Sequence, residues 1–117
     1  DQGIAVLRSI QETSPQSFSV RLSLLSPVDR EGVMVKSPMP AGAVSEGIET
    51  PDGVSTVSLP GALGLYLHRL PAGKTDIILH FTAEVSGIFQ VPPATAVLLS
   101  DTSVRGNSNA QTVEVLK

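Results

Sequence analysis

The sequence contains no cysteine and no tryptophan, and only three Phe and one Tyr supply aromatic rings. Without cysteine the chain has no disulfide, no thiolate nucleophile and no zinc cluster built on thiolates. The eight Lys and Arg residues are scattered and the net charge is −3, so the sequence argues against nucleic-acid binding. Long apolar runs are also missing, since none approaches the roughly 18 residues that a membrane-spanning helix needs.

What is present indicates a single globular domain. The chain has 117 residues, of which 41% are hydrophobic and 16% charged, and this is enough to bury a core. Its first residue is Asp1 rather than Met, and its first residues do not read as a signal peptide. We interpret residues 1–117 as one domain of a longer or processed protein.

Alternating apolar and polar residues predict strands throughout the chain. Residues 17–25 place Phe18 and every second residue after it on one side, with serines and Arg21 on the other. Residues 75–85 alternate in the same way. Further strands are predicted at 3–10, 32–37, 53–59, 63–70, 94–101 and 110–116. The expected core residues are Phe18, Val20, Leu22, Leu67, Leu79 and Phe81.

Turn residues separate these strands. Pro-Asp-Gly at 51–53 and Pro-Ala-Gly at 71–73 combine a proline that presets φ with a glycine that allows positive φ, and 60–61 and 105–107 are similar. The short link at 71–74 predicts a hairpin between residues 63–70 and 75–85. Residues 39–54 are expected to cross one end of the fold, with one helical turn at 45–50. The predicted fold is all-β, a single antiparallel β-sandwich of about eight strands.

Two histidines raise the question of catalysis. If residues 63–70 and 75–85 form a hairpin, His68 lies beside Asp76, and a base oriented by a carboxylate is half of a nucleophilic triad. The other half is missing, because Ser45 lies in Gly-Ala-Val-Ser-Glu-Gly, which has one residue too many for a nucleophile elbow. We therefore interpret His68 and His80 as solvated residues and expect no enzyme activity.

Metal and phosphate sites are equally poorly supported. Glu46, Glu49 and Asp52 lack the dense oxygen-ligand spacing of a calcium loop. Gly73-Lys74 resembles the end of a phosphate-binding loop, but His68 stands where the first glycine is required. We expect no metal and no cofactor.

Several motifs in order resemble one protein family. The most specific are Met39-Pro40-Ala41-Gly42, Leu70-Pro71-Ala72-Gly73, and Gly87-Ile88-Phe89 followed by Val91-Pro92-Pro93-Ala94. Together with VRGNS at 104–108 and QTVEVLK at 111–117, they resemble the C-terminal domain of bacterial-type alpha-2-macroglobulins over nearly the whole chain.

This resemblance implies a macroglobulin-like sandwich at the end of a large extracellular or periplasmic protease trap. Full-length members bond to a protease through a thioester in another domain, and the absence of cysteine means that this chain cannot carry that reaction. The implied partners are other domains of the parent chain, or a receptor or surface protein. The family's last domain packs against the thioester domain or binds a receptor.

The same resemblance suggests an interdomain contact at Pro92, Pro93, Leu98, Leu99, Ser100 and Asp101. Two adjacent prolines cannot donate to a sheet ladder, so they form a rigid lead-in to the strand at 94–101. Asp101, Val104 and Gly106 keep the family's places, but Leu99 and Ser100 stand where the family has methionine and tyrosine. We therefore expect Ser100 at the surface, and docking rather than shielding of a thioester.

An exposed interface is also expected from two apolar residues. Ile78 falls on the outward side of its strand, and Leu98 is out of step with Val97 and Leu99. The alternative to a macroglobulin domain is an immunoglobulin-like spacer or adhesion module of a cell-surface protein.

Overall fold

The computed structural model describes residues 3–40, 43–50, 53–83 and 86–115, and these residues form strands without any helix. The strands are β1 (Ala5–Ser14), β2 (Ser17–Ser26), β3 (Arg30–Pro38), β4 (Ala43–Glu49), β5 (Val54–Leu59), β6 (Ala62–Leu70), β7 (Gly73–Ala83), β8 (Gly87–Val91), β9 (Thr95–Leu98), β10 (Asp101–Asn107) and β11 (Gln111–Val115). The all-β prediction is confirmed. Within the described part of the chain, no segment is a helix able to cross a membrane.

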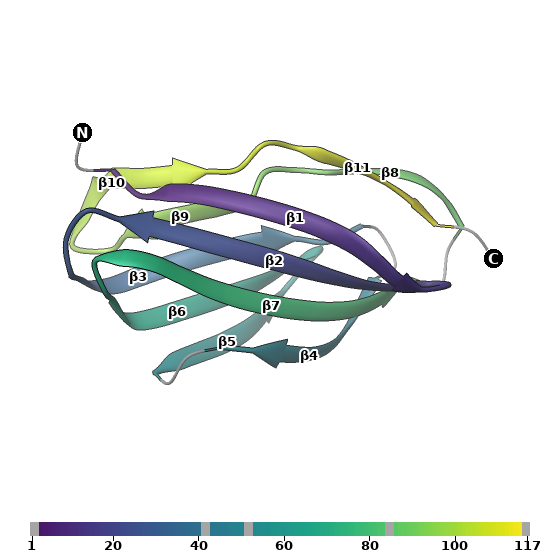
Figure 1. Cartoon of the computed structure of the whole chain (residues 1–117), viewed down its shortest axis with the longest axis horizontal. Helices are drawn as coiled ribbons and strands as arrows, with labels where there is room; N and C mark the ends of the chain where they lie inside the picture. Colours follow the sequence, from purple (N-terminus) through teal and green to yellow (C-terminus); the bar gives the residue numbers. More distant parts are fainter. Residues whose placement is uncertain (1–2, 41–42, 51–52, 84–85, 116–117) are drawn as a thin grey trace.

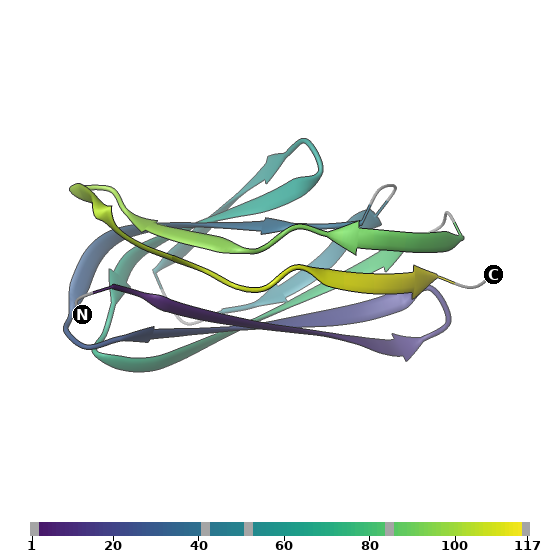
Figure 2. The same cartoon turned by 90° about the horizontal axis from the view of Figure 1, so that it is seen from above.

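Two antiparallel sheets face each other as the layers of a sandwich (Figure 1). One has four strands in the order β1-β2-β7-β4, and the other has five in the order β10-β9-β3-β6-β5. A separate two-stranded ribbon, β11-β8, extends from the β9–β10 side toward the end where the C-terminus lies (Figures 1 and 2). The predicted antiparallel sandwich is therefore confirmed.

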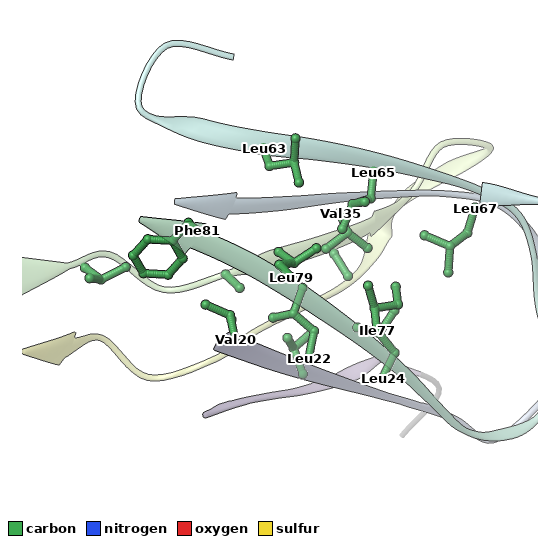
Figure 3. Packing of buried hydrophobic residues seen from close by; sticks show 14 of the residues in the cluster. Val20, Leu22, Leu24, Val35, Leu63, Leu65, Leu67, Ile77, Leu79 and Phe81 are labelled. Carbon is green, nitrogen blue, oxygen red and sulfur yellow. The ribbon is translucent and has the colours of Figure 1, made fainter. Parts of the chain in front are cut away.

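The core lies between the two main sheets and is built by alternation. Side chains of β2 and β7 point inward from one sheet and meet those of β3 and β6 from the other (Figure 3). Phe18 and Phe81 are cross-strand partners whose rings stack with centroids 5.3 Å apart. All six expected core residues are at most 4% exposed: Phe18, Val20, Leu22, Leu67, Leu79 and Phe81.

Eleven strands are present in the described residues, where about eight were expected. The helical turn predicted at 45–50 is wrong, because residues 43–49 form β4 and pair with β7. β8 and β10 were not predicted as separate strands. These three strands carry few buried side chains, so their pairing comes mainly from the backbone of a neighbouring strand.

The hairpin predicted between residues 63–70 and 75–85 is also wrong. β6 pairs with β3 and β5, whereas β7 pairs with β2 and β4 in the other sheet. Each strand buries one side in the core between the two sheets, so β6 and β7 contribute to that core from opposite layers. The 71–73 turn therefore carries the chain between sheets, with Gly73 at φ 102°. Residues 39–54 were expected to cross one end of the fold, but Ala43–Glu49 within this range form β4 in the other sheet from β3 and β5.

Pro92 and Pro93 interrupt what is otherwise one long pair of strands. The β9–β10 ladder ends at Thr95 opposite Asn107, and the ladder between β8 and β11 begins at Val91 opposite Gln111. Between them, Ser108 N donates to Ala94 O at 2.8 Å, and Ala94 N donates to the Ser108 hydroxyl at 2.9 Å. The predicted lead-in therefore separates the ribbon from the five-stranded sheet.

Candidate functional site

The solvent side of the five-stranded sheet carries an apolar row. Cα pairing places Val97 of β9, Met34 of β3 and Tyr66 of β6 directly beside one another, across the three central strands. All three side chains are half-buried, although among the described strands no other layer covers this side. We call this side the outer face; its strand positions include Gly32, Met34, Lys36, Pro38, Ser55, Val57, Leu59, Ala62, Gly64, Tyr66, His68, Thr95, Val97, Arg105 and Asn107.

Tyr66 is held in place by its neighbours on the outer face. The His68 ring meets the Tyr66 ring edge-on, with centroids 4.7 Å apart and planes at 87°. Gly32 has φ 74°, and a Cβ built on it would lie 3.5 Å from the Tyr66 hydroxyl oxygen. Gly32 O also accepts a 2.9 Å hydrogen bond from Leu99 N, which places the β9–β10 turn next to this end of β3.

The charges on the outer face are of one sign. Lys36 and Arg105 are exposed, and Arg105 lies opposite Val97 in the ladder. None of the outer-face positions defined above is Asp or Glu, although the whole chain has a net charge of −3. The face thus combines an apolar centre with a cationic margin.

The six residues predicted to form an interdomain contact fall into two separate places. Pro92 and Pro93 precede β9, whereas Leu99 and Ser100 form the turn after it and Asp101 begins β10. Leu99 and Ser100 are exposed, which confirms the surface position expected for Ser100. Asp101 accepts hydrogen bonds from the Ser103 hydroxyl at 2.6 Å and from Ser103 N at 3.2 Å. These bonds lower the pKa of the Asp101 carboxyl.

Two residues expected to be exposed are not free for docking. Leu98 is 9% exposed and belongs to the core, so its side chain offers little surface for the predicted interdomain contact. Ile78 is half-buried and shares a shallow depression with polar residues of β1 and β2, including Ser9 and Arg21. Neither residue forms an apolar patch.

Arg8 occupies the gap that the two prolines leave between the ribbon and the five-stranded sheet. Its guanidinium donates to Pro92 O at 2.5 Å, Val91 O at 3.1 Å and Asn109 O at 3.0 Å. Proline has no N–H with which to satisfy an opposing carbonyl, and the planar guanidinium supplies donors instead. Partial burial lowers the pKa of Arg8 from its ordinary value. Sequence reasoning missed this role, because the bonds span more than 80 positions in the chain.

The histidines do not form the predicted carboxylate pair. His68 and Asp76 lie on β6 and β7 in different sheets, and Asp76 instead accepts a 2.6 Å bond from the Ser23 hydroxyl. His80 lies 2.6 Å from Glu49 in an exposed contact between β7 and β4. Ser45 is exposed on β4.

The acidic group considered for calcium is only partly described. Glu46 accepts a bond from the Thr82 hydroxyl at 3.2 Å and Glu49 contacts His80, while Asp52 lies outside the described residues. In the residues that the structure describes, no three His, Asp or Glu side chains converge as metal ligands.

Comparison with known proteins establishes the fold alone. No family model matches the sequence, and no curated protein matches it either. A non-cellulosomal cohesin from the archaeon Archaeoglobus fulgidus superposes with a TM-score of 0.68 at 8% identity, covering 98% of this chain and 92% of the cohesin. The chitin-binding domain of a chitinase from Pyrococcus furiosus gives 0.60 at 8% identity, covering 82% of this chain and 87% of that domain.

A third similar structure comes from a crystallised complex of a CaDoc0917 variant with CaCohA2, with a TM-score of 0.65 and 8% identity over 97% of this chain and 99% of the other. None of these three is a macroglobulin, so the resemblance seen in the motifs stays a prediction.

Proposed function

We propose that this chain is a non-catalytic binding module that docks a neighbouring protein domain through its outer face. The observation that carries this proposal is the row Val97–Met34–Tyr66 across the middle of a sheet side that no other layer of the described residues covers. A solvated sheet side normally presents polar residues in alternation. Tyrosine and methionine are also enriched where proteins meet.

The margin of the outer face indicates the chemistry of the docked surface. Lys36 and Arg105 flank the apolar row without a carboxylate at the other outer-face positions. A domain that presents an apolar centre bordered by Asp or Glu would complement both features. Such charges mainly affect the association rate and partner choice, so we expect salt to weaken docking without abolishing it.

The non-catalytic part of the proposal is supported by where the polar residues lie. A nucleophile needs its base within hydrogen-bond reach. His68 and His80 lie in different sheets, and the short contact of His80 is to Glu49 rather than to a hydroxyl.

Carbohydrate binding is the second candidate, because chitin-binding domains share this fold. Tyr66 is the only aromatic residue at the outer-face positions, while Phe18 and Phe81 are buried against each other. One ring edge-on to His68 offers little flat surface on which a sugar chain can stack. We therefore expect the chain to stay in solution when it is mixed with insoluble chitin. Retention that is lost in Tyr66→Ala would favour the carbohydrate function instead.

We further infer, from the motif resemblance alone, that the parent protein is an extracellular or periplasmic relative of the alpha-2-macroglobulins. The test of this identity is the rest of the gene product. A large upstream region with a Cys-x-Glu-Gln thioester motif would support it. A tandem array of similar sandwiches would support the alternative, an adhesion or spacer module.

Docking is tested by oxidative footprinting of the full-length gene product and of the isolated 117-residue chain. We expect Met34 and Tyr66 to be modified several-fold more slowly in the full-length product. Met39 is a matched control, because it is also half-buried but packs against the core near the start of β4. Equal modification of Met34 in the two samples would overturn docking of a neighbouring domain on this face.

A further inference from the structure

The edge strand β5 differs from the other edges of the two main sheets. The edges are β1 and β4 in one sheet and β10 and β5 in the other. β1, β4 and β10 each carry charged residues, whereas β5 reads Val-Ser-Thr-Val-Ser-Leu and carries none. Charges, prolines and bulges are the usual means of preventing an edge from pairing with another chain.

The other edges are protected by structure as well as by charge. β1 and β10 lie against each other so closely that a Cβ on Gly106 would be 1.7 Å from Ile4 O. β4 has a register shift between Ser45 and Gly47 and carries two glutamates. β5 pairs with β6 without a break and lies on the opposite side of the sandwich from β1 and β10 (Figure 1). In the ribbon, β8 is also uncharged, but it has only five residues and ends at two prolines.

The free hydrogen-bonding groups of β5 are fixed by its pairing with β6. His68 N donates to Gly53 O at 3.1 Å, which makes Gly53 and His68 a hydrogen-bonded pair. Because such pairs alternate along an antiparallel ladder, Ser55, Val57 and Leu59 bond to β6. The N–H and C=O groups of Val54, Thr56 and Ser58 therefore point away from the sheet.

Exposed apolar side chains accompany these free groups. Val57 is 49% exposed and Leu59 is 38% exposed, both at outer-face positions. They lie over Gly64, where an added Cβ would be 2.8 Å from Val57 Cγ1 and 3.2 Å from Leu59 Cδ1. The glycine lets both side chains lie flat on β6. Leu59 also lines a depression at this end of β5 together with Val44 of β4.

We propose that β5 pairs antiparallel with β5 of a second copy of this chain, joining the two five-stranded sheets into one. The outer-face side chains of β5 are at the odd-numbered positions 55, 57 and 59. They lie on the same side of the joined sheet in both copies only if odd positions pair with odd positions. With Val57 opposite Val57 of the second copy, Thr56 and Ser58 exchange hydrogen bonds with Ser58 and Thr56 of that copy. Val57 is then a non-hydrogen-bonded pair, in which side chains approach most closely.

A second copy suits this edge better than an unrelated strand. Pairing β5 with itself places no charge opposite another, because neither strand carries one. The same register puts each Leu59 opposite Ser55 and diagonal to the Val57 of the other copy, so four exposed apolar side chains become one cluster. A two-fold axis also closes the assembly at two copies.

The absence of cysteine makes a sharp test possible, since Val57→Cys introduces the only thiol. Cβ atoms in such a pair lie about 4.5–5.5 Å apart, close to what a disulfide requires. We expect mild oxidation to give a cross-linked dimer of Val57→Cys. Two controls should remain monomeric: Ser55→Cys, whose thiols would be about 13 Å apart, and Leu7→Cys, at a site 61% exposed on the edge strand β1.

Sedimentation of the chain without a cross-link completes the test. We expect the wild type to dimerise reversibly, and Val57→Lys to raise the dimer Kd at least tenfold, while Leu7→Lys leaves it unchanged. Thr56→Pro removes only an N–H that faces away from β6, and it should have the same effect as Val57→Lys. A wild type that is monomeric up to millimolar concentration would overturn the proposal. So would a dimer that survives both changes in β5, or equal cross-linking of all three cysteine variants.

Discussion

At the scale of single residues, the described aromatic rings serve the core more than the surface. Phe18 and Phe81 face each other on neighbouring strands, and their rings stack at an interplanar angle of 13°. With only three Phe and one Tyr in the chain, this pair supplies much of the aromatic area that the sandwich buries. Tyr66 is left for the outer face.

Replacing Phe81 by Ala should therefore destabilise the fold. Phe81 is 2% exposed, and its removal leaves a cavity beside Phe18 that the two sheets can only partly close. We expect the free energy of unfolding to fall by about 3–5 kcal/mol, measured by urea denaturation. Ile88→Ala is the matched control, because Ile88 is 69% exposed, and it should change stability by about 0.5 kcal/mol at most. An equal loss in both variants would contradict this account of the core.

At the scale of strands, the contact between β1 and β10 closes one side of the sandwich. Gly106 pairs with Ala96 of β9. A Cβ built on Gly106 would point toward the backbone just before β1. A Cβ at this position would lie 1.7 Å from Ile4 O, a distance that no rotamer can relieve because the contact is to backbone. Glycine is thus required there by close approach rather than by a positive φ.

Gly106→Ala should push β1 away from β10 and cost about 1–3 kcal/mol of stability. Gly47→Ala provides the control, because a Cβ at Gly47 in the edge strand β4 meets nothing within 4 Å. We expect a shift of about 0.5 kcal/mol or less for that variant. The comparison is made by thermal and urea unfolding of both proteins. If Gly47→Ala proved the more harmful of the two, the steric explanation for Gly106 would be wrong.

The strands with strong alternation were predictable from the sequence, and those with weak alternation were not. β2 and β7 have a fully buried side, so the alternation predicted both strands and their inward side chains. β7 begins two residues before the predicted start at 75, and the predicted end at 84–85 lies outside the described residues. β4 was mistaken for a helical turn, because it has no such side and pairs through its backbone with β7. The 71–73 turn was correctly placed, but local turn chemistry does not say whether the chain stays in one sheet.

The candidate site was predicted less well than the fold. The motifs pointed to the segment from Pro92 to Asp101, which the structure divides between the two ends of β9, with Leu98 in the core. The outer face depends on the order β9-β3-β6-β5, and strand order is a long-range property. Met34, Tyr66 and Val97 are far apart in the chain and become neighbours only through that order.

At the scale of the whole molecule, the ribbon is attached to the sandwich at a point where ordinary strand pairing stops. Val91, Val113 and Val115 are buried against the core, but the ladder between the ribbon and the five-stranded sheet is broken at the two prolines. Arg8 lies on β1 of the other sheet, and its side chain donates to Val91 O at the end of β8 and to Asn109 O between β10 and β11. It therefore joins the four-stranded sheet to both strands that lead into the ribbon.

Arg8→Lys should loosen the ribbon while leaving the rest of the sandwich intact. A lysine keeps the charge but not the planar fork that reaches three carbonyls, and each hydrogen bond from a charged donor contributes about 1.5–3 kcal/mol. We expect amide hydrogen exchange at 87–91 and 111–115 to become about tenfold faster or more, with β2 and β7 unchanged. Arg21→Lys, at an exposed position on β2, should leave both regions as they are. Uniform acceleration across all strands in Arg8→Lys would show instead that Arg8 supports global stability, and unchanged exchange in the ribbon would show that burial of the three valines suffices to hold it.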